Sequence, residues 1–327
     1  MSRRAVLGFV LGLVPAWAPA AAQQPASATG FQRVLWVSAQ QASDPQYLAR
    51  IQAAGYQGIN LRPGADPGPA TAAGLGFYLD QPAGKGYLEL RDADWEPVRN
   101  GYEQKRDPAL LKRPACLQDP DLLAATSARA VAAAKAARGP GLRFVAIADE
   151  ASATRHNQPL DVCRCEACRQ ALVAFLRGRH GTVQKLNEAW GTEYADWSDV
   201  AALTTDQVRR RELGGTSFPS NLRPYGEVLE FVDGQFAHAV ARITADVQGA
   251  VPGVPVGLTG IQAPMAFGGH DYARLLPSQT LIEPYDTGGA LALARCLRPA
   301  ADCYNPLSLI ASKYLPILFT ASAFFIF

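Results

Sequence analysis

Short apolar runs recur along the chain and are separated by segments whose apolar residues fall three or four positions apart. Short runs rich in β-branched and aromatic residues are typical of buried strands, and the wider spacing is typical of amphipathic helices. The pattern therefore predicts six strands, at residues 32–37, 58–61, 76–79, 143–148, 254–259 and 280–282.

The segments between these strands carry signals for helix starts. Asp44-Pro45 and Asp119-Pro120 each offer an N-cap residue followed by proline at the first helical position, and a helix is predicted after each pair. Residues 81–118 show neither periodicity and are predicted to be a long irregular connection, which in compact domains is usually functional. The remaining predicted helices are residues 169–180, 183–190 and 225–248.

Strands that alternate with helices indicate a parallel sheet with crossover helices, as in a doubly wound sheet or a (β/α)8 barrel. No Gly-x-Gly-x-x-Gly motif follows the first strand, so a dinucleotide-binding fold has no support. Long connections after the third and fourth strands favour an α/β fold of the (β/α)8 TIM-type barrel, with its chemistry on the loops that follow the strands. We expect this barrel over residues 31–306, incomplete at its C-terminal end.

The two ends of the chain depart from this pattern. Residues 1–22 resemble a signal peptide, with Arg3 and Arg4 ahead of a short apolar stretch and small residues at a cleavage site. We expect export to the periplasm or the extracellular space, with residues 23–30 as a linker. Residues 307–327 form an apolar tail, for which a buried strand, a membrane anchor and a truncated or frameshifted chain are the alternatives. We favour an incomplete chain over an anchor.

Composition excludes several classes of function. The 31 Lys and Arg residues nearly balance the 29 Asp and Glu residues, so the net charge of +2 gives no electrostatic footprint for nucleic acid or an anionic membrane. Hydrophobic residues make up 48% of the chain, which is enough for a large core.

Four cysteines have the spacing of a metal site. Cys163, Cys165 and Cys168 form a C-x-C-x-x-C motif after the fourth strand, and Cys116 follows the third strand. Zinc accepts four thiolate ligands, and the loops after strands three and four are neighbours on one face of a barrel. The spacing therefore predicts a structural zinc site that joins the two loops, with disulfides or free thiols as the alternative.

The segment that contains these cysteines resembles glycoside hydrolase family 42, the β-galactosidase-like enzymes. The matching residues are DE at 149–150, CRCEACRQALVAFLRGRHGTVQKLNEAWGTEY at 163–194 and RPACLQDP at 113–120. The resemblance implies a catalytic (β/α)8 barrel, retaining hydrolysis of terminal β-galactosides or related glycans, and zinc bound by the same four cysteines. It also implies trimers built through a domain after the barrel, which we do not expect in a chain of this length.

The resemblance assigns the acid/base catalyst to Glu150, at the end of the fourth strand. A glycosidic oxygen is a poor leaving group unless it is protonated as the bond breaks, so this carboxyl must hold a proton near neutral pH. The family has Asn before this glutamate, where it bonds the 2-hydroxyl of the sugar. Here the position is Asp149, which can donate a hydrogen bond only when protonated.

Other residues are candidates for contact with a carbohydrate substrate. The sugar-binding Arg of the family corresponds to Lys112 or Arg113, of which we favour Arg113. Trp36, at the end of the first strand, and Trp95, in the long connection, are candidates for stacking on a sugar ring. Tyr285, near the end of the sixth strand, is a further candidate.

The nucleophile is the least certain assignment from the sequence. A retaining mechanism needs a second carboxylate, which the family places after strand seven. Glu283, Asp286 and Asp302 are the last carboxylates of the chain, and Glu283 is our candidate. Because this match is weak, a barrel that binds carbohydrate without hydrolysing it, or a fragment that lacks the nucleophile, remains the alternative function.

Overall fold

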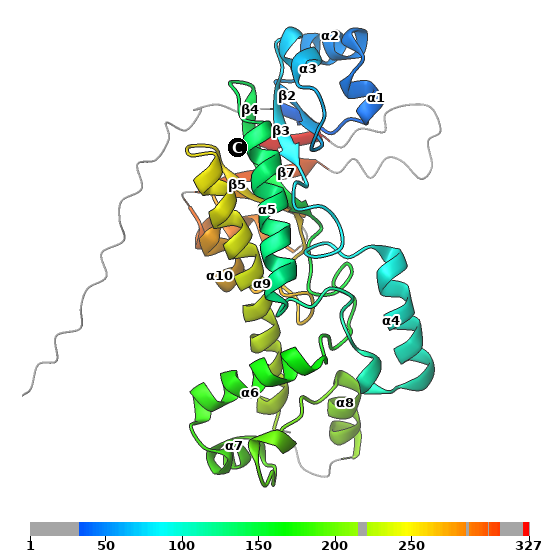
Figure 1. Ribbon diagram of the computed structural model, residues 1–327, viewed down its shortest axis with the longest axis vertical. Helices are drawn as coiled ribbons and strands as arrows, with labels where there is room; N and C mark the ends of the chain where they lie inside the picture. The colour runs from blue at the N-terminus through cyan, green and yellow to red at the C-terminus, as the bar shows by residue number, and fades with distance from the viewer. Residues whose placement is uncertain (1–32, 215–220, 286–287, 300, 308–322, 327) are drawn as a thin grey trace, which may run out of the picture.

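The computed structural model describes residues 33–214, 221–285, 288–299, 301–307 and 323–326 (Figure 1). The expected signal peptide and linker lie outside the described residues, as does Asp286. Of the expected apolar tail, only residue 307 and residues 323–326 are described.

The strands form a closed barrel in sequence order, which confirms the predicted fold class. Their bounds are β1 (Arg33–Leu35), β2 (Gly58–Leu61), β3 (Gly76–Asp80), β4 (Leu142–Asp149), β5 (Val256–Ile261), β6 (Leu281–Pro284), β7 (Asp302–Leu307) and β8 (Ala323–Ile326). The first seven strands pair in parallel. The eighth, which falls in the expected tail, is antiparallel to both of its neighbours. Among the described residues, the ring therefore lacks the eighth parallel strand of a (β/α)8 barrel.

Helices cover the barrel and extend beyond it. They are α1 (Ala39–Ala42), α2 (Pro45–Ala53), α3 (Gly68–Ala72), α4 (Asp92–Lys105), α5 (Pro120–Ala136), α6 (Glu166–His180), α7 (Val183–Trp190), α8 (Thr205–Gly214), α9 (Arg223–Ala250), α10 (Tyr272–Leu275) and α11 (Ala290–Leu297), with 3₁₀ turns η1 (Pro108–Leu110), η2 (Trp197–Asp199) and η3 (Leu276–Ser278). The predicted N-caps are confirmed, because Asp44 and Asp119 each accept two main-chain N–H bonds from the first turn. No described helix is long and apolar enough to span a bilayer.

The connection after β3 is not irregular throughout, as the sequence had suggested. It contains α4, which the periodicity missed because only two of its residues, Trp95 and Tyr102, are buried and because Pro97 and Gly101 lie in its middle. Trp95 is 1% exposed in a cluster with Leu90, and its indole N–H donates to Gln158. Trp95 is therefore a core residue, and its assignment to a sugar pocket was wrong.

The core has two layers around the strands. Side chains that include Tyr78 and Phe144, whose rings stack with centroids 4.5 Å apart, form one cluster of strand residues. A larger cluster packs the other faces of the strands against the helices. Helices α5 and α9 lie side by side along the barrel (Figure 1).

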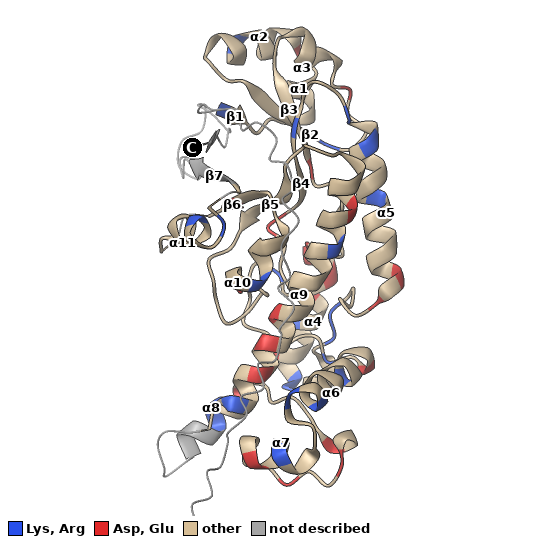
Figure 2. Cartoon of the chain, turned by 90° about the vertical axis from the view of Figure 1, so that its left-hand side faces the viewer, with Lys and Arg blue, Asp and Glu red and all other residues tan. Residues whose placement is uncertain are grey.

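The helices α6, α7 and α8 lie together at the end of the molecule away from α1–α3 (Figures 1 and 2). A buried carboxylate on α9, Glu227, connects α6 and α7 to α9: its oxygens accept hydrogen bonds from Trp190 Nε1 and Arg223 Nε and lie 2.8 Å from His180 Nε2. His180 and Trp190, which belong to the segment that resembles family 42, therefore have a structural role, because each bonds to the buried carboxylate of Glu227.

Candidate active site

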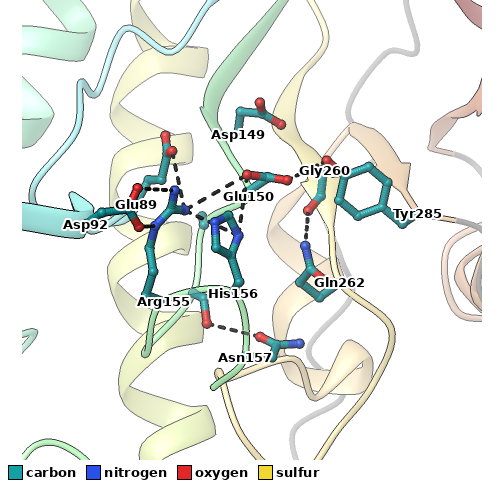
Figure 3. A network of polar contacts seen from close by, with 12 residues as sticks. Glu89, Asp92, Asp149, Glu150, Arg155, His156, Asn157, Gly260, Gln262 and Tyr285 are labelled. Carbon is teal, nitrogen blue, oxygen red and sulfur yellow. Dashed lines mark hydrogen bonds and ion pairs between the residues drawn. The ribbon is translucent and has the colours of Figure 1, made fainter. Parts of the chain in front are cut away.

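The candidate acid/base residue lies where β4 leaves the barrel (Figure 3). Glu150 has a positive φ of 48°, and its main-chain N–H donates to Thr259 on β5. A non-glycine residue in this conformation is strained and is a frequent feature of functional sites. The side chain of Glu150 is 29% exposed, so its carboxyl group can be reached from outside the protein.

Each oxygen of the Glu150 carboxyl group has its own neighbours (Figure 3). Oε1 accepts a 2.7 Å hydrogen bond from the hydroxyl of Tyr285, next to the end of β6. Oε2 lies 3.4 Å from His156 Nδ1 and 3.9 Å from Arg155 Nη1. Residues from the ends of two strands therefore meet at this carboxyl group, as expected for a barrel active site.

Arg155 links this carboxyl group to the long connection after β3. Its guanidinium forms a 2.8 Å bond from Nε to Asp92 and lies 3.8 Å from Glu89, while its side chain is only 9% exposed. Glu89 is buried and also pairs with Lys85 at 2.7 Å. Because this guanidinium is shared by three carboxylates, it fixes the loop after β4 relative to the connection after β3.

Asp149 lies beside Glu150 and has only neutral hydrogen-bond partners. Its oxygens accept bonds of 3.3 Å from Gln81 Nε2 and from the hydroxyl of Thr259. Burial, together with the negative charges of Asp80, Glu150 and Glu89, raises the pKa of Asp149 to about 7. This environment favours a protonated Asp149 carboxyl group at a higher pH than an ordinary aspartate.

Glu283, the candidate nucleophile, is nearly inaccessible. Its side chain is on β6 and 2% exposed, Oε2 accepts a hydrogen bond from the main-chain N–H of Gly260, and Oε1 is buried without a hydrogen-bond partner among the described residues. Burial raises the pKa of Glu283 well above its usual value, against the opposing effect of the Gly260 hydrogen bond, and the charges of Asp149 and Glu150 raise it further. This environment favours a neutral carboxyl group.

A third strand end adds a carboxyl group that the sequence reasoning did not select. Asp80, the last residue of β3, is buried and lies 3.4 Å from Arg62 Nε. Trp36 follows β1 and its side chain lies near Asp80 at the same end of the barrel, with 36% of its surface exposed. The position of Trp36 suits a contact with a ligand, which stays a prediction.

Arg113 is 5% exposed, and its guanidinium group bonds main-chain carbonyl oxygens of Tyr87, Ala115, Ser152 and Ala153. These bonds join the segments that follow β3 and β4. To contact a sugar, Arg113 would have to give up some of these main-chain bonds. The structure therefore supports a structural role for Arg113 and not the predicted contact with substrate. The alternative residue at this position, Lys112, is exposed.

The four cysteines meet as predicted. All four sulfur atoms lie within 4.8 Å of one another, and Cys116 Sγ is 3.4 Å from the sulfurs of both Cys165 and Cys168. These separations exceed the ~2.05 Å of a disulfide bond, and the cysteines are free thiols. The two loops after β3 and β4 are therefore neighbours, and the disulfide alternative is not realised.

The cluster has the properties of a thiolate metal site. Tetrahedral zinc with Zn–S bonds of ~2.3 Å requires sulfur atoms ~3.8 Å apart; in the cluster two pairs lie 3.4 Å apart and all lie within 4.8 Å of one another. Main-chain N–H groups of Arg113 and Gln118 donate to Cys163 and Cys116, which suits thiolate acceptors. Hydrogen bonds among the thiols lower the pKa of Cys163 below its usual value and raise the pKa values of Cys116 and Cys168, so one proton-poor sulfur is shared among them. The residues present fit a metal ion with four sulfur ligands.

Some site residues could not be found from the sequence. Asp80 and Gln81 lie at the end of β3. The rule that selected Glu150, that functional residues of a barrel follow its strands, would have selected them too if it had been applied to every strand. Arg155 and His156 have no such signal, because they come from an irregular loop whose course depends on the rest of the fold. The ring nitrogen Nδ1 of His156 lies 3.4 Å from the Glu150 carboxyl group.

Comparison with known proteins supports the resemblance. The family model for the β-galactosidases of glycoside hydrolase family 42 matches residues 101–207, which include Glu150 and all four clustered cysteines. None of the curated protein sequences matches this chain.

Solved structures of several glycosidases share the fold. A β-galactosidase from the haloarchaeon Halorubrum lacusprofundi aligns over 78% of this chain and 40% of its own length, with 12% identity and a TM-score of 0.56. A β-galactosidase from Bacillus circulans sp. alkalophilus aligns over 80% of this chain and 42% of its own, with 14% identity and a TM-score of 0.55. The catalytic domain of a β-amylase from Paenibacillus polymyxa aligns over 83% and 84%, with 13% identity and a TM-score of 0.52.

These likenesses establish the fold but not the substrate, because enzymes with different activities match about equally well. The chain spans about two fifths of the length of the β-galactosidases that it matches. The resemblance to glycoside hydrolase family 42 is confirmed over residues 101–207, within a barrel that the family-42 β-galactosidases share.

Proposed function

We propose that the whole chain is a family-42 barrel that hydrolyses terminal β-galactosides or related glycans with retention of configuration, with Glu150 as the acid/base catalyst. The observation that supports this proposal is the setting of Glu150: a partly exposed carboxyl group at the end of a barrel strand, with Tyr285 on one oxygen and His156 and Arg155 near the other. Its position inside the segment matched by the family model adds to this support.

The contacts of Glu150 suggest how its change of charge is accommodated. Glu150 passes its proton to the glycosidic oxygen, while Oε1 keeps the hydrogen bond from the hydroxyl of Tyr285. His156 and Arg155 lie on the Oε2 side, where they stabilise the carboxylate that forms after transfer. The same carboxylate would then take a proton from water in the second step.

Glu283 is the proposed nucleophile because it is the next carboxyl group along the barrel that faces the same cluster. Attack on the sugar requires an ionised and accessible carboxylate, so Glu283 has to lose its proton and become exposed when substrate binds.

The test is hydrolysis of nitrophenyl β-galactoside by the wild type, Glu150→Gln and Glu166→Gln. Glu166 is a matched control because its carboxylate pairs only with surface groups on its own helix, Arg169 and Gln170. We expect kcat/KM to fall at least 100-fold in Glu150→Gln and to be unchanged in Glu166→Gln. Equal activity of all three proteins would exclude Glu150 from the mechanism.

A second candidate function is carbohydrate binding without hydrolysis. The burial of Glu283 favours it, because a carboxyl group without access to the sugar cannot act as a nucleophile. Saturable binding of isopropyl β-thiogalactoside in calorimetry, with no release of nitrophenol from nitrophenyl β-galactoside by the same protein, would support this candidate over the first.

We also propose that the four cysteines hold a structural zinc ion. Four sulfur ligands leave no open coordination position, so the ion would link the two loops and would not act on substrate. Cys116 supplies the ligand from the loop after β3, and Cys163, Cys165 and Cys168 supply the others. Metal analysis of the purified protein should give one zinc per chain.

Finally, we propose that the protein is exported after removal of residues 1–22. Support comes from the charged and apolar segments of the N-terminus. N-terminal sequencing of the protein from its native host should begin near Gln23. Recovery from the cytoplasm with Met1 retained would contradict export.

A further inference from the structure

The carboxyl groups around Glu150 differ in whether a cation balances them. Asp80 lies 3.4 Å from Arg62, Glu89 lies 2.7 Å from Lys85, and Asp92 and Glu150 lie 2.8 and 3.9 Å from Arg155. Asp149 and Glu283 belong to the same group but form no ion pair with any described residue. Two partly or fully buried carboxyl groups are thus left without a balancing charge.

The hydrogen bonds of Asp149 do not compensate for this. Gln81 and Thr259 are neutral, and both can also accept a hydrogen bond through the amide oxygen or the hydroxyl oxygen. The same two residues can therefore serve a neutral carboxyl group as well as a carboxylate. A buried carboxylate that receives only neutral hydrogen bonds costs more than the protonated form.

The groups that face Asp149 from neighbouring elements add to this cost. They are Tyr78 and Asp80 on β3, Glu89 in the connection after β3, Glu150 at the end of β4, and Glu283 and Tyr285 on and after β6. All of them are neutral or negative. Their charges and the burial raise the pKa of Asp149 to about 7.

We propose that Asp149 keeps a proton near neutral pH and presents a carboxylic O–H to the ligand, as an amide N–H would at this position. The side chain is partly exposed and adjoins Glu150, so its O–H lies within reach of a sugar bound over that residue. The ligand contact rests on the proposed function, whereas the location of the proton does not.

The first arm of the test measures unfolding of the wild type and Asp149→Asn in denaturant from pH 4 to pH 8. The native state holds a proton that the unfolded state has released, so the wild type loses stability relative to Asp149→Asn as pH rises from about 4 to about 7. The ratio of their folding constants should change by up to tenfold per pH unit and level off above pH 7. A constant ratio would overturn the proposal.

Asp246→Asn is the matched control for this arm. Hydrogen bonds from Ser127 and Arg242 lower the pKa of Asp246, so this carboxylate is ionised in the native state throughout the range from pH 5 to pH 8. Its ratio to the wild type should stay flat there. A slope in the control equal to that of Asp149→Asn would show that the slope has another origin and would overturn the assignment.

The second arm measures binding of isopropyl β-thiogalactoside by calorimetry at pH 6 and pH 8. The wild type should bind more weakly at pH 8, Asp149→Asn should bind equally at both, and Asp149→Leu, which has no donor, should bind weakly at both. Equal pH dependence in the wild type and Asp149→Asn would overturn the donor function. If the stability ratio changes with pH in the first arm but none of the proteins binds the thiogalactoside, the assignment of the proton to Asp149 stands and the proposed function is contradicted.

Discussion

The sulfur cluster and the carboxyl cluster lie at the same end of the barrel strands β3 and β4 but are built by different means, and the carboxyl cluster also includes Glu283 on β6. Four thiols, of which Cys168 is buried and the others are partly buried, converge on one point, where a single metal ion can satisfy all of them. The carboxyl groups near Glu150 differ in burial and in cation partners, so similar side chains reach different protonation states. The comparison teaches that one cluster is suited to stability and the other to chemistry, although both depend on the segments after β3 and β4.

The largest effect is expected from breaking the sulfur cluster. Replacement of Cys168 by Ser removes a buried ligand, so zinc should be lost and the free energy of unfolding should fall by about 5 kcal/mol or more. Zinc content and the urea midpoint measure both effects. Cys296→Ser is the control, because Cys296 is exposed and outside the cluster. A Cys168→Ser protein with unchanged zinc content would contradict the comparison.

The second-largest effect is expected from replacing Arg113, which connects the segments after β3 and β4. Arg113→Met leaves buried carbonyl oxygens without their donor, and we expect a loss of about 3 kcal/mol in the free energy of unfolding. The exposed neighbour gives the contrast: Lys112→Ala should change stability by less than about 0.5 kcal/mol. If Lys112→Ala instead abolishes sugar binding, Lys112 is the substrate residue that the resemblance predicted.

A pH effect of intermediate size is expected from His270, which is buried against the ring of Phe236 and bonds to the main chain just after Glu150. Its Nε2 donates to the carbonyl of Ala151, and burial lowers its pKa to about 4. Because the unfolded state takes up a proton below pH 6.5 that the native state refuses, stability should fall as pH drops from about 6.5 to about 4.

Replacement of His270 by Gln should remove this loss, which amounts to about 2 kcal/mol between pH 6.5 and pH 5. Urea unfolding of both proteins at a series of pH values measures it. A variant with the same acid sensitivity as the wild type would indicate that His270 is protonated in the native state.

The smallest effect is expected from Tyr285→Phe. This change removes one hydrogen bond to Glu150 and leaves the ring in place, so kcat/KM should fall about tenfold while the urea midpoint stays nearly constant. Steady-state kinetics on nitrophenyl β-galactoside check it. An equal loss of stability and activity would mean that Tyr285 supports the barrel and not the carboxyl group.

The sequence was sufficient for features that depend on local spacing. Paired Asp-Pro starts located two helices, apolar runs located the six parallel strands from β1 to β6, and the C-x-C-x-x-C motif with Cys116 located the sulfur cluster. Each of these signals acts over a few residues or, for the sulfur cluster, through the order of neighbouring strands.

Features that depend on packing between distant segments were not predictable. Helix α4 buries only two residues and has no clear period, and Trp95 was taken for a ligand contact because its burial depends on Gln158 and Leu160 far along the chain. Arg155 and His156 lie on an irregular loop whose course the sequence does not predict. The structural role of Arg113 was not predictable either, because it bonds main-chain carbonyl groups, which every residue has.

The measurement that tests the central claim most directly is the dependence of kcat/KM on leaving group in a series of aryl β-galactosides. If Glu150 donates the proton, the loss in Glu150→Gln relative to the wild type should grow with the basicity of the leaving group, from a small loss on dinitrophenyl galactoside to more than 100-fold on phenyl galactoside. A loss of the same size across the whole series would contradict proton donation by Glu150.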